Sequence, residues 1–485
     1  MNSNFTKELN KYIVRSNLKL EDIAGKLGIR RPRLSKYKTG LMLPSKNYFP
    51  EFIDKITDIL RLSPTEKYNL SKVYFKELIG EEKYNEAIEI TNLINKIAKI
   101  SDLSSEKVYK KVTFPKEKID FKVIYNVKVI NKLIIDLLDE EVSLRTESKI
   151  DFFINHKYHS FFEILQAYMK YVRVRQIVHF NNAQSDIAMI SDIILFTLYN
   201  EKNYEVFYYN IFSENLLDYT TNFMPYFIIF TKHVITISED FETAFLFNSG
   251  EIIKYYTENF ERAISNCKPL IERFDSVYEV LGNYKHFDSI NKSPQYYIQP
   301  NPCFSEFYTK ELIDKKLKNN IENRKELFEI VCMRYLNLPD LDNSITIFSK
   351  EGLENFVNSG RLMEFPKVFV ESLNEMERLE LLKKLKKSME EGRRKEYIAK
   401  PFKFSIPENI AILISKDCVN FTAFNYDDNN YSFNSISIYE SNICEVFCDF
   451  IINLSFVTDF LYTEKETMEI IDNHINILEK SCHTE

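Results

Sequence analysis

The chain has 485 residues, of which 45% are hydrophobic and 28% charged, and its formal net charge is −7. A chain of this size and composition can bury sizeable cores in two or three domains, which argues against intrinsic disorder. It has neither an apolar segment near Met1 nor about 18 uninterrupted apolar residues, so we expect a soluble cytoplasmic protein with no membrane partner.

Positive charge is concentrated at the N-terminus. Residues 1–75 contain 15 Lys and Arg against 7 Asp and Glu, whereas the rest of the chain has 49 against 64. The first 75 residues therefore carry +8 and the remainder −15. We expect the basic end to meet nucleic acid, because phosphates would repel the acidic remainder.

The N-terminal segment is predicted to form a bundle of five helices. Apolar residues from Phe5 to Ile13 recur at helical spacing and predict a first helix that ends near Ser16. In the second helix, Ile23 and Leu27 lie on one face and Gly28 supplies the turn that follows. This pattern predicts a helix-turn-helix elbow.

The third predicted helix covers residues 30–39, where Leu34 and Tyr37 point inward and basic residues cover the other faces. Gly40 ends it, and Pro44-Ser45 is expected to introduce the fourth helix. The fifth opens with Ser63-Pro-Thr-Glu66, a capping box with proline in the first turn.

These residues resemble the Xre family, the Cro/C1-type helix-turn-helix, over roughly residues 5–62. The landmarks are Ile23-Ala24, Leu27-Gly28-Ile29, Leu34-Ser35-Lys36-Tyr37, Gly40 and Pro44. Lys19 and Arg30 depart from the family, because they stand where it has a small hydroxyl N-cap. Both helices are therefore expected to be less firmly capped.

The resemblance implies that the helix 30–39 lies in the DNA major groove. Arg31 and Lys36 match positions that read bases in the family, whereas Arg33, Lys38 and Thr39 are expected to meet phosphates or the groove wall. The alternative is that the basic run is only a solvated helix face. The predicted DNA-binding residues are Arg30, Arg31, Pro32, Arg33, Ser35, Lys36, Lys38 and Thr39.

The rest of the chain is predicted to mix strands and helices, so the fold class is α+β multidomain. Residues 80–102 predict an amphipathic helix that connects the domains or pairs with its counterpart in a dimer, and 121–129 have strand character. Strands and helices then alternate up to a hairpin and a helix that ends at Ile264. The expected domains are 1–75 (helix-turn-helix), 76–145 (helical linker), 146–270 (first α/β lobe) and 271–485 (helical insert, second lobe and C-terminal helix).

A probable internal duplication follows from a second run of the same pattern. Residues 228–237 align without gaps against 412–421, and each run is followed by another strand and a helix with aromatic residues. This predicts halves of roughly 148–266 and 344–455. A chance likeness of two amphipathic hairpins is the alternative.

The order of elements, used twice, resembles the two-lobed phospholipase-D-like fold. Enzymes of that fold need His-x-Lys in each lobe, and none of the seven histidines here is followed two residues later by Lys. The C-terminal region also resembles a group of long helix-turn-helix regulators of low-GC bacteria, through residues 344–356 and 377–382.

Other chemistry is not indicated by the sequence. Cys444 and Cys448 share one face of an apolar helix and are interpreted as core, and His156 and His159 as turn residues. The basic run Lys383–Lys387 is interpreted as a solvated face rather than a second nucleic-acid site. We therefore expect no catalytic residue, no metal, no cofactor and no enzyme.

The function expected from the sequence is that of a homodimeric transcriptional regulator that reads an inverted repeat in double-stranded DNA. Its C-terminal region would sense an unknown small-molecule, peptide or protein effector. The alternative is a phage-type or defence-system repressor whose C-terminal region binds a partner protein. A third reading is an enzyme with its own operator-binding domain.

Overall fold

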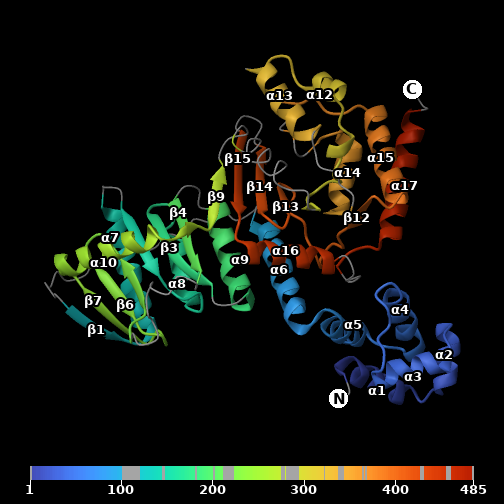
Figure 1. Cartoon of the computed structure of the whole chain (residues 1–485), viewed down its shortest axis with the longest axis horizontal. Coiled ribbons are helices and arrows are strands. Elements are labelled where there is room, and N and C mark those ends of the chain that lie inside the picture. The colour runs from blue at the N-terminus through green and yellow to red at the C-terminus, as the bar shows by residue number, and fades with distance from the viewer. Residues whose placement is uncertain are drawn as a thin grey trace. The chain divides into compact units, whose positions relative to one another are not determined.

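The computed structural model describes residues 3–100, 121–144, 148–180, 183–199, 203–210, 223–274, 279, 294–321, 323–336, 343–362, 365, 369–426, 431–454 and 460–482. These residues form an α+β multidomain fold with an N-terminal helical region and mixed sheets, as predicted (Figure 1). None of the described helices is long and apolar enough to cross a membrane.

The chain divides into two compact units, each built from separate stretches of sequence. The first contains Met1–Ala98, Lys292–Glu408 and Glu445–Glu485, and the second contains Lys99–Asn291 and Asn409–Cys444. The four segments expected from the sequence are continuous, and their boundaries stay a prediction.

The first unit begins with the five predicted helices. Aromatic rings fill the space between them: Tyr37 meets Phe52 edge-on at a centroid distance of 5.6 Å, and Phe49 stacks on Tyr74. Burial of these rings contributes to the stability of the bundle, together with the aliphatic residues of the same core. The helices are α1 (Asn4–Ser16), α2 (Leu20–Leu27), α3 (Arg31–Thr39), α4 (Phe49–Leu60) and α5 (Pro64–Ile79).

The fourth helix begins later than Pro44-Ser45 had suggested. The carbonyl of Pro44 accepts a hydrogen bond of 2.8 Å from the buried Tyr74 hydroxyl, and a turn over residues 46–48 then leads to Phe49. Pro50 lies in the first turn of α4, where no N–H is needed. The start of α4 is therefore marked by Pro50, and not by Pro44 as predicted.

A salt bridge joins the end of α1 to the start of α5. The Arg15 guanidinium donates to both carboxylate oxygens of Glu66, the longer bond being 3.1 Å. Glu66 also accepts from the Ser63 backbone N–H at 2.9 Å and donates its own N–H to the Ser63 hydroxyl, so the predicted capping box is confirmed. These bonds lower the pKa of Glu66 from 4.5 to about 2, the one from Arg15 contributing most.

The predicted amphipathic helix is present as α6 (Glu81–Ile100), and its side chains bind other stretches of the first unit. Lys83 forms an ion pair with Asp449, and the Asn95 amide bridges the Lys403 carbonyl (3.3 Å) and the Ser405 N–H (2.7 Å). The contacts explain why this helix is amphipathic within a single chain. Pairing with a second copy stays a prediction.

The remaining part of the first unit contains a short parallel run of strands, in the order β12-β11-β10, and several helices. Helices α15 and α17 lie side by side (Figure 1) and are linked by ion pairs. The elements are β10 (Tyr296–Ile298), η3 (Ser305–Phe307), α12 (Lys310–Lys316), α13 (Arg324–Tyr335), β11 (Ser344–Phe348), α14 (Lys350–Ser359), α15 (Glu375–Glu390), β12 (Arg394–Ile398), α16 (Ser441–Leu454, which begins in the second unit) and α17 (Glu464–Cys482).

The second unit contains a mixed sheet with the strand order β1-β7-β6-β5-β2-β3-β4-β8 and an antiparallel run β13-β14-β15-β9. The predicted alternation of strands and helices between residues 149 and 264 is confirmed. The elements are β1 (Phe121–Tyr125), α7 (Val127–Ser143), β2 (Lys149–Phe153), α8 (His159–Gln166), β3 (Arg173–Phe180), α9 (Ala183–Tyr199), β4 (Tyr204–Asn210), β5 (Tyr226–Ile229), β6 (Val234–Ile237), β7 (Thr243–Phe247), α10 (Gly250–Ile264), β8 (Lys268–Pro269), β9 (Ile271–Phe274), β13 (Ile410–Ile414), β14 (Val419–Tyr426) and β15 (Tyr431–Ile438).

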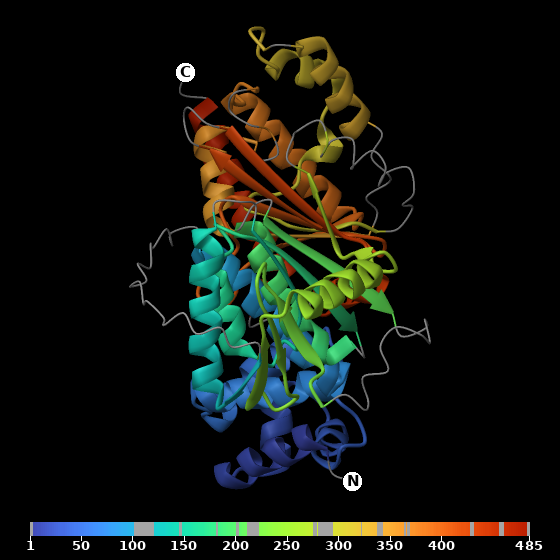
Figure 2. The same ribbon diagram turned by 90° about the vertical axis from the view of Figure 1, so that its left-hand side faces the viewer.

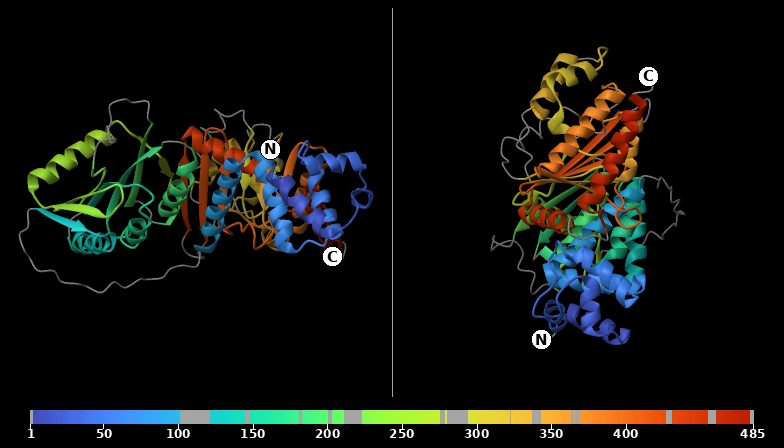
Figure 3. Two further views of the ribbon diagram at one scale, coloured as in Figure 1. Left: turned by 90° about the horizontal axis from the view of Figure 1, so that it is seen from below. Right: turned by 90° about the vertical axis from the view of Figure 1, so that its right-hand side faces the viewer.

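Helices cover both faces of the mixed sheet. Phe152 on β2 contacts Phe161 of α8, whereas its neighbour Phe153 belongs to the cluster around Phe260 of α10. Because successive side chains of a strand point to opposite faces, α8 and α10 lie on opposite sides (Figure 2). Figure 3 shows α7 and α10 separated by the strands in the same way.

The strand predicted over residues 121–129 is shorter than expected. It ends at Tyr125, and Asn126, with φ +77°, caps α7 by accepting a 2.9 Å hydrogen bond from the Lys128 N–H. β1 pairs with β7, so this strand is part of the mixed sheet.

The predicted duplication is visible in strand order and direction. The parallel run β2-β3-β4 has its counterpart in β10-β11-β12, and the antiparallel run β5-β6-β7-β1 in β13-β14-β15-β9. The alignment of 228–237 with 412–421 places β5 on β13 and β6 on β14. The predicted start of the second half, residue 344, is wrong: β11 there corresponds to β3, and the counterpart of β2 is β10. That strand is only three residues long, too short to leave a periodic signal.

Each parallel run buries an arginine beside a carboxylate. Arg175 on β3 donates two 2.8 Å hydrogen bonds to Asp151 on β2, and Arg394 on β12 donates to Glu396 on the same strand. Burial raises the pKa of Glu396 to about 7 although Arg394 opposes the shift. Such pairs add little net stability over apolar residues, but removing one partner leaves an uncompensated buried charge.

We expect Gly352→Ala to destabilise the first unit. A Cβ at residue 352 would lie 1.9 Å from the Pro300 carbonyl oxygen. That oxygen accepts hydrogen bonds from the N–H and the hydroxyl of Ser349, so it cannot move away without breaking them. The cost is expected to be at least ~1–3 kcal/mol, the range for an overpacked site. Thermal unfolding midpoints of the full chain measure it. In the control variant Gly25→Ala the Cβ meets no atom within 4 Å, and an unchanged or higher midpoint is expected. Equal midpoints for both variants would show that α14 has room to shift.

We expect Glu66→Gln to lower stability at neutral pH and to lose this effect in acid. Because folding lowers the carboxyl's pKa from 4.5 to about 2, its contribution is complete above about pH 4.5 and disappears as pH falls toward about 2. Urea unfolding midpoints of both proteins across this range provide the measurement. Glutamine keeps an amide oxygen for the Ser63 N–H, so the comparison isolates the charge. A difference that is the same at every pH would contradict the pairing with Arg15.

Candidate nucleic-acid interface

The elbow between α2 and α3 depends on the backbone conformation of the glycine at its centre. Gly28 adopts φ +70°, and the N–H groups of Gly28 and Ile29 close the end of α2 on the Gly25 (3.1 Å) and Ala24 (3.0 Å) carbonyls. A glycine reaches this left-handed conformation without the clash of a Cβ atom. The chain can therefore reverse within three residues and present a second helix.

The two N-caps lack side-chain hydrogen bonds, as the departures from the family pattern had indicated. Lys19 precedes α2 and Arg30 precedes α3, both in extended conformation and neither with a capping bond from its side chain. Pro32 has no N–H, and the Arg33 N–H donates to the Arg30 carbonyl at 2.9 Å, so the start of α3 offers an anion few backbone donors. Any attraction for phosphate oxygens at this end of α3 would therefore come mainly from the cationic side chains around Arg30.

Helix α3 presents its polar face to solvent because two residues anchor the opposite face. Leu34 and Tyr37 are fully buried. The predicted DNA-binding side chains lie on the remaining surface, with Ser35 and Lys38 half-buried and the others exposed: Arg30, Arg31, Pro32, Arg33, Lys36 and Thr39. The structure thus brings the whole predicted set together on one helix and its N-cap.

The helix carries positive charge without a carboxylate of its own. Its sequence, RPRLSKYKT, contains four cationic side chains and no Asp or Glu. Among the described residues, no ion pair involves Arg30 or Lys36, so these charges are available to an external anion. Phosphate neutralisation by Lys and Arg is the main source of protein–DNA affinity.

Arg31 forms an exposed ion pair that the sequence did not reveal. Its guanidinium lies 3.3 Å from the Glu21 carboxylate in the first turn of α2, and the two side chains are 62% and 68% exposed. An ion pair this exposed contributes little to stability and is readily exchanged for another partner. Glu21 therefore restrains Arg31 in the free protein without blocking it.

Arg33 is exposed, but its guanidinium is bound to neighbouring side chains. Its Nε–H donates a 2.7 Å hydrogen bond to the Tyr37 hydroxyl, and its guanidinium lies over the rings of Tyr37 (5.9 Å) and Tyr48 (5.2 Å). Contact with a base would require it to give up these interactions. Tyr48 was not singled out from the sequence, because its approach to α3 depends on how α4 packs.

The C-terminal end of α3 is fixed by bonds to the backbone. The Thr39 hydroxyl donates to the Ser35 (2.9 Å) and Lys36 (3.3 Å) carbonyls, and the Asn10 amide of α1 donates to the Lys38 carbonyl at 2.9 Å. Thr39 can therefore only accept a further hydrogen bond. The last turn is positioned by α1, which leaves the first turns of α3 as the more accessible part.

The second basic run differs from α3 because its lysines are paired with acidic side chains. The lysines of residues 383–387 on α15 each have an acidic partner, and two of these, Glu479 and Asp472, come from α17 at 2.7 and 2.6 Å. Their charge is compensated within the protein. This supports the interpretation of the run as a helix face.

The close pair of cysteines lies in the core. Cys444 and Cys448 are buried on α16, in agreement with the prediction that they belong to the core. Within the described ranges, no group of three or more His, Cys, Asp or Glu side chains is arranged to hold a metal ion.

Comparison with known proteins does not assign the chain to a family. No protein-family model and no curated protein matches it. Among solved structures, similarity is found to TrmBL2, an archaeal chromatin protein with a novel mode of DNA binding (14% identity, 54% of this chain and 93% of that one, TM-score 0.23). It is also found to the phosphatidylserine synthase of Haemophilus influenzae Rd KW20 (9% identity, 75% and 93%, TM-score 0.25). At these TM-scores neither similarity supports a conclusion about fold or function.

Proposed function

We propose that this protein binds double-stranded DNA through α3 and acts as a transcriptional regulator. The observation that carries the proposal is the surface of α3, where exposed cations without a carboxylate follow a helix-turn-helix elbow. A helix of this kind fits the major groove, and its first turns face base edges there. Arg30 and Lys36 have no ion-pair partner among the described residues and Arg31 has only an exposed one, whereas the lysines of α15 are paired, which favours a binding surface over a solvated face.

The finer parts of the proposal extend the expectations from the sequence. The protein would act as a homodimer on an inverted repeat with half-sites about one helical turn apart. The C-terminal region would sense an effector, and no catalytic step would be involved. In the alternative, that region binds a partner protein and the complex acts as a phage-type or defence-system repressor; a copurifying polypeptide would favour it.

We expect Arg31→Ala to relax sequence preference. In the proposed complex Arg31 leaves Glu21 and reads a base, a contact worth about 1–3 kcal/mol of discrimination. A preferred duplex is first selected from genomic fragments with the full-length protein. The affinity ratio between that duplex and a scrambled one, measured by fluorescence anisotropy at fixed salt, should then fall about tenfold or more. An unchanged ratio would mean that Arg31 does not face a base.

We expect Lys38→Ala to weaken binding to every duplex by a similar factor. A lysine at the groove wall neutralises phosphate, so its loss should reduce the slope of log affinity against log salt by about 1. Lys67→Ala is the matched control, because it removes one charge from α5, outside the proposed interface. If both variants changed the slope equally, net charge rather than the surface of α3 would govern binding.

A further inference from the structure

The helix-turn-helix domain contains a hollow that the proposed DNA contact does not use. It has a volume of about 940 Å³ and lies among α1, α2 and the junction of α4 with α5. This volume falls in the range of small-molecule pockets, roughly 300–1,000 Å³. The DNA-binding side chains on α3 do not line it.

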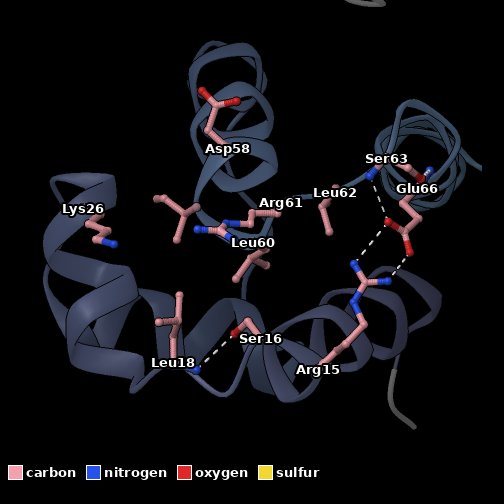
Figure 4. A pocket seen from close by; sticks show the side chains of 11 residues that line it. Arg15, Ser16, Leu18, Lys26, Asp58, Leu60, Arg61, Leu62, Ser63 and Glu66 are labelled. Atoms are coloured by element: carbon pink, nitrogen blue, oxygen red, sulfur yellow. Dashed lines mark hydrogen bonds and ion pairs between the residues drawn. The ribbon is translucent and has the colours of Figure 1, made fainter.

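Two cations in this hollow have no partner among the residues that the structure describes. Figure 4 shows the Lys26 ammonium and the Arg61 guanidinium extending toward one another from α2 and from the end of α4. Across the described residues, neither side chain forms a hydrogen bond or an ion pair. Arg15, the third cation of the lining, is already bound to Glu66. Lys26 and Arg61 are therefore free to hold an anion.

Arg61 occupies a backbone position that does not favour arginine. It caps α4 in the left-handed region, with φ +51° and ψ +53°, where glycine or asparagine is more easily accommodated. An unusual conformation of this kind in a non-glycine residue is often retained because of what the side chain does. Here the conformation directs the guanidinium over the hollow.

The charges of the lining select the class of anion. Arg15, Lys26 and Arg61 stand against Asp58 and Glu66, which leaves one uncompensated positive charge. A second negative charge on the ligand would be repelled by Asp58. A monoanion is therefore favoured over a phosphate dianion or the backbone of DNA.

The apolar part of the lining indicates the rest of the ligand. Leu18 and Ile59 are half-buried, pack against the domain core and border the hollow. Placing an apolar group on these side chains removes it from water. We propose that this hollow binds a small organic monocarboxylate, with its carboxylate between Lys26 and Arg61 and its apolar body on Leu18 and Ile59.

Such a ligand would connect α2 to the α4–α5 junction. Lys26 lies in the last turn of α2, just before the Gly28 elbow that leads into α3. The site therefore places a small molecule next to the element that orients the proposed recognition helix, inside the N-terminal domain rather than in the C-terminal region.

The test is calorimetric titration of the full chain with benzoate, isovalerate and N-acetyl-leucine, in the absence of DNA. We expect at least one of them to bind, its neutral amide not to bind, and inorganic phosphate to bind more weakly. Arg61→Asn and Lys26→Gln should each weaken binding at least tenfold. Lys55→Gln, which removes a cation outside the hollow, should not.

Arg61→Asn suits this test because asparagine tolerates the left-handed conformation, so the fold is retained; its thermal midpoint without ligand checks this. The proposal is overturned if none of the three acids binds, if an amide or phosphate binds as tightly as the acid, or if binding survives both substitutions. Since DNA is absent, these outcomes are independent of the DNA-binding proposal.

Discussion

Tyr37 is the residue on which the geometry of the proposed interface depends. Its ring packs against Phe52 of α4, its carbonyl lies 3.4 Å from the Thr6 hydroxyl of α1, and its own hydroxyl accepts from Arg33. The side chain is completely buried. Together with the buried Leu34, Tyr37 thus sets the rotation of α3 about its axis, and Tyr37 also holds an arginine on its surface. The exposure of the other cations follows from that rotation.

The cations around α3 fall into three groups with different freedom. Arg33 is held by aromatic rings, Arg31 by an exposed carboxylate, and Arg30 and Lys36 by no described ion pair. Exchange of an exposed ion pair for a phosphate or a base costs little, whereas release of Arg33 gives up a hydrogen bond and stacking on two rings. In the proposed complex, Arg30, Arg31 and Lys36 would therefore exchange partners more easily than Arg33, which is held by its contacts with Tyr37 and Tyr48.

The α/β part of the chain shows how far a fold can be repeated while its chemistry changes. The strand order of the two parallel and two antiparallel runs is the same, yet the buried ion pair uses neighbouring strands in one run and a single strand in the other. A sheet tolerates a change in which strands carry the ion pair, because the strand register is set by the apolar pattern. A buried charge needs only a partner of opposite charge within hydrogen-bond distance.

The sequence by itself determined the elements whose signals are local. Apolar spacing gave the helices of the N-terminal domain, Gly28 and Gly40 their ends, and the Ser63–Glu66 capping box the start of α5. Gapless alignment of two hairpins was enough to predict the duplication. The predicted DNA-binding residues also came from one contiguous helix, which is why they could be named without a structure.

Only the tertiary structure decided what depends on contacts between distant residues. The pairing of Arg31 with Glu21, the position of Tyr48 under Arg33, and the hollow around Arg61 result from the angles at which helices cross. The counterpart of β2 was missed because β10 is short and is recognised by its partner strand, not by its own pattern. Helical periodicity tells which face of an element is buried, but it carries no information about which element covers that face.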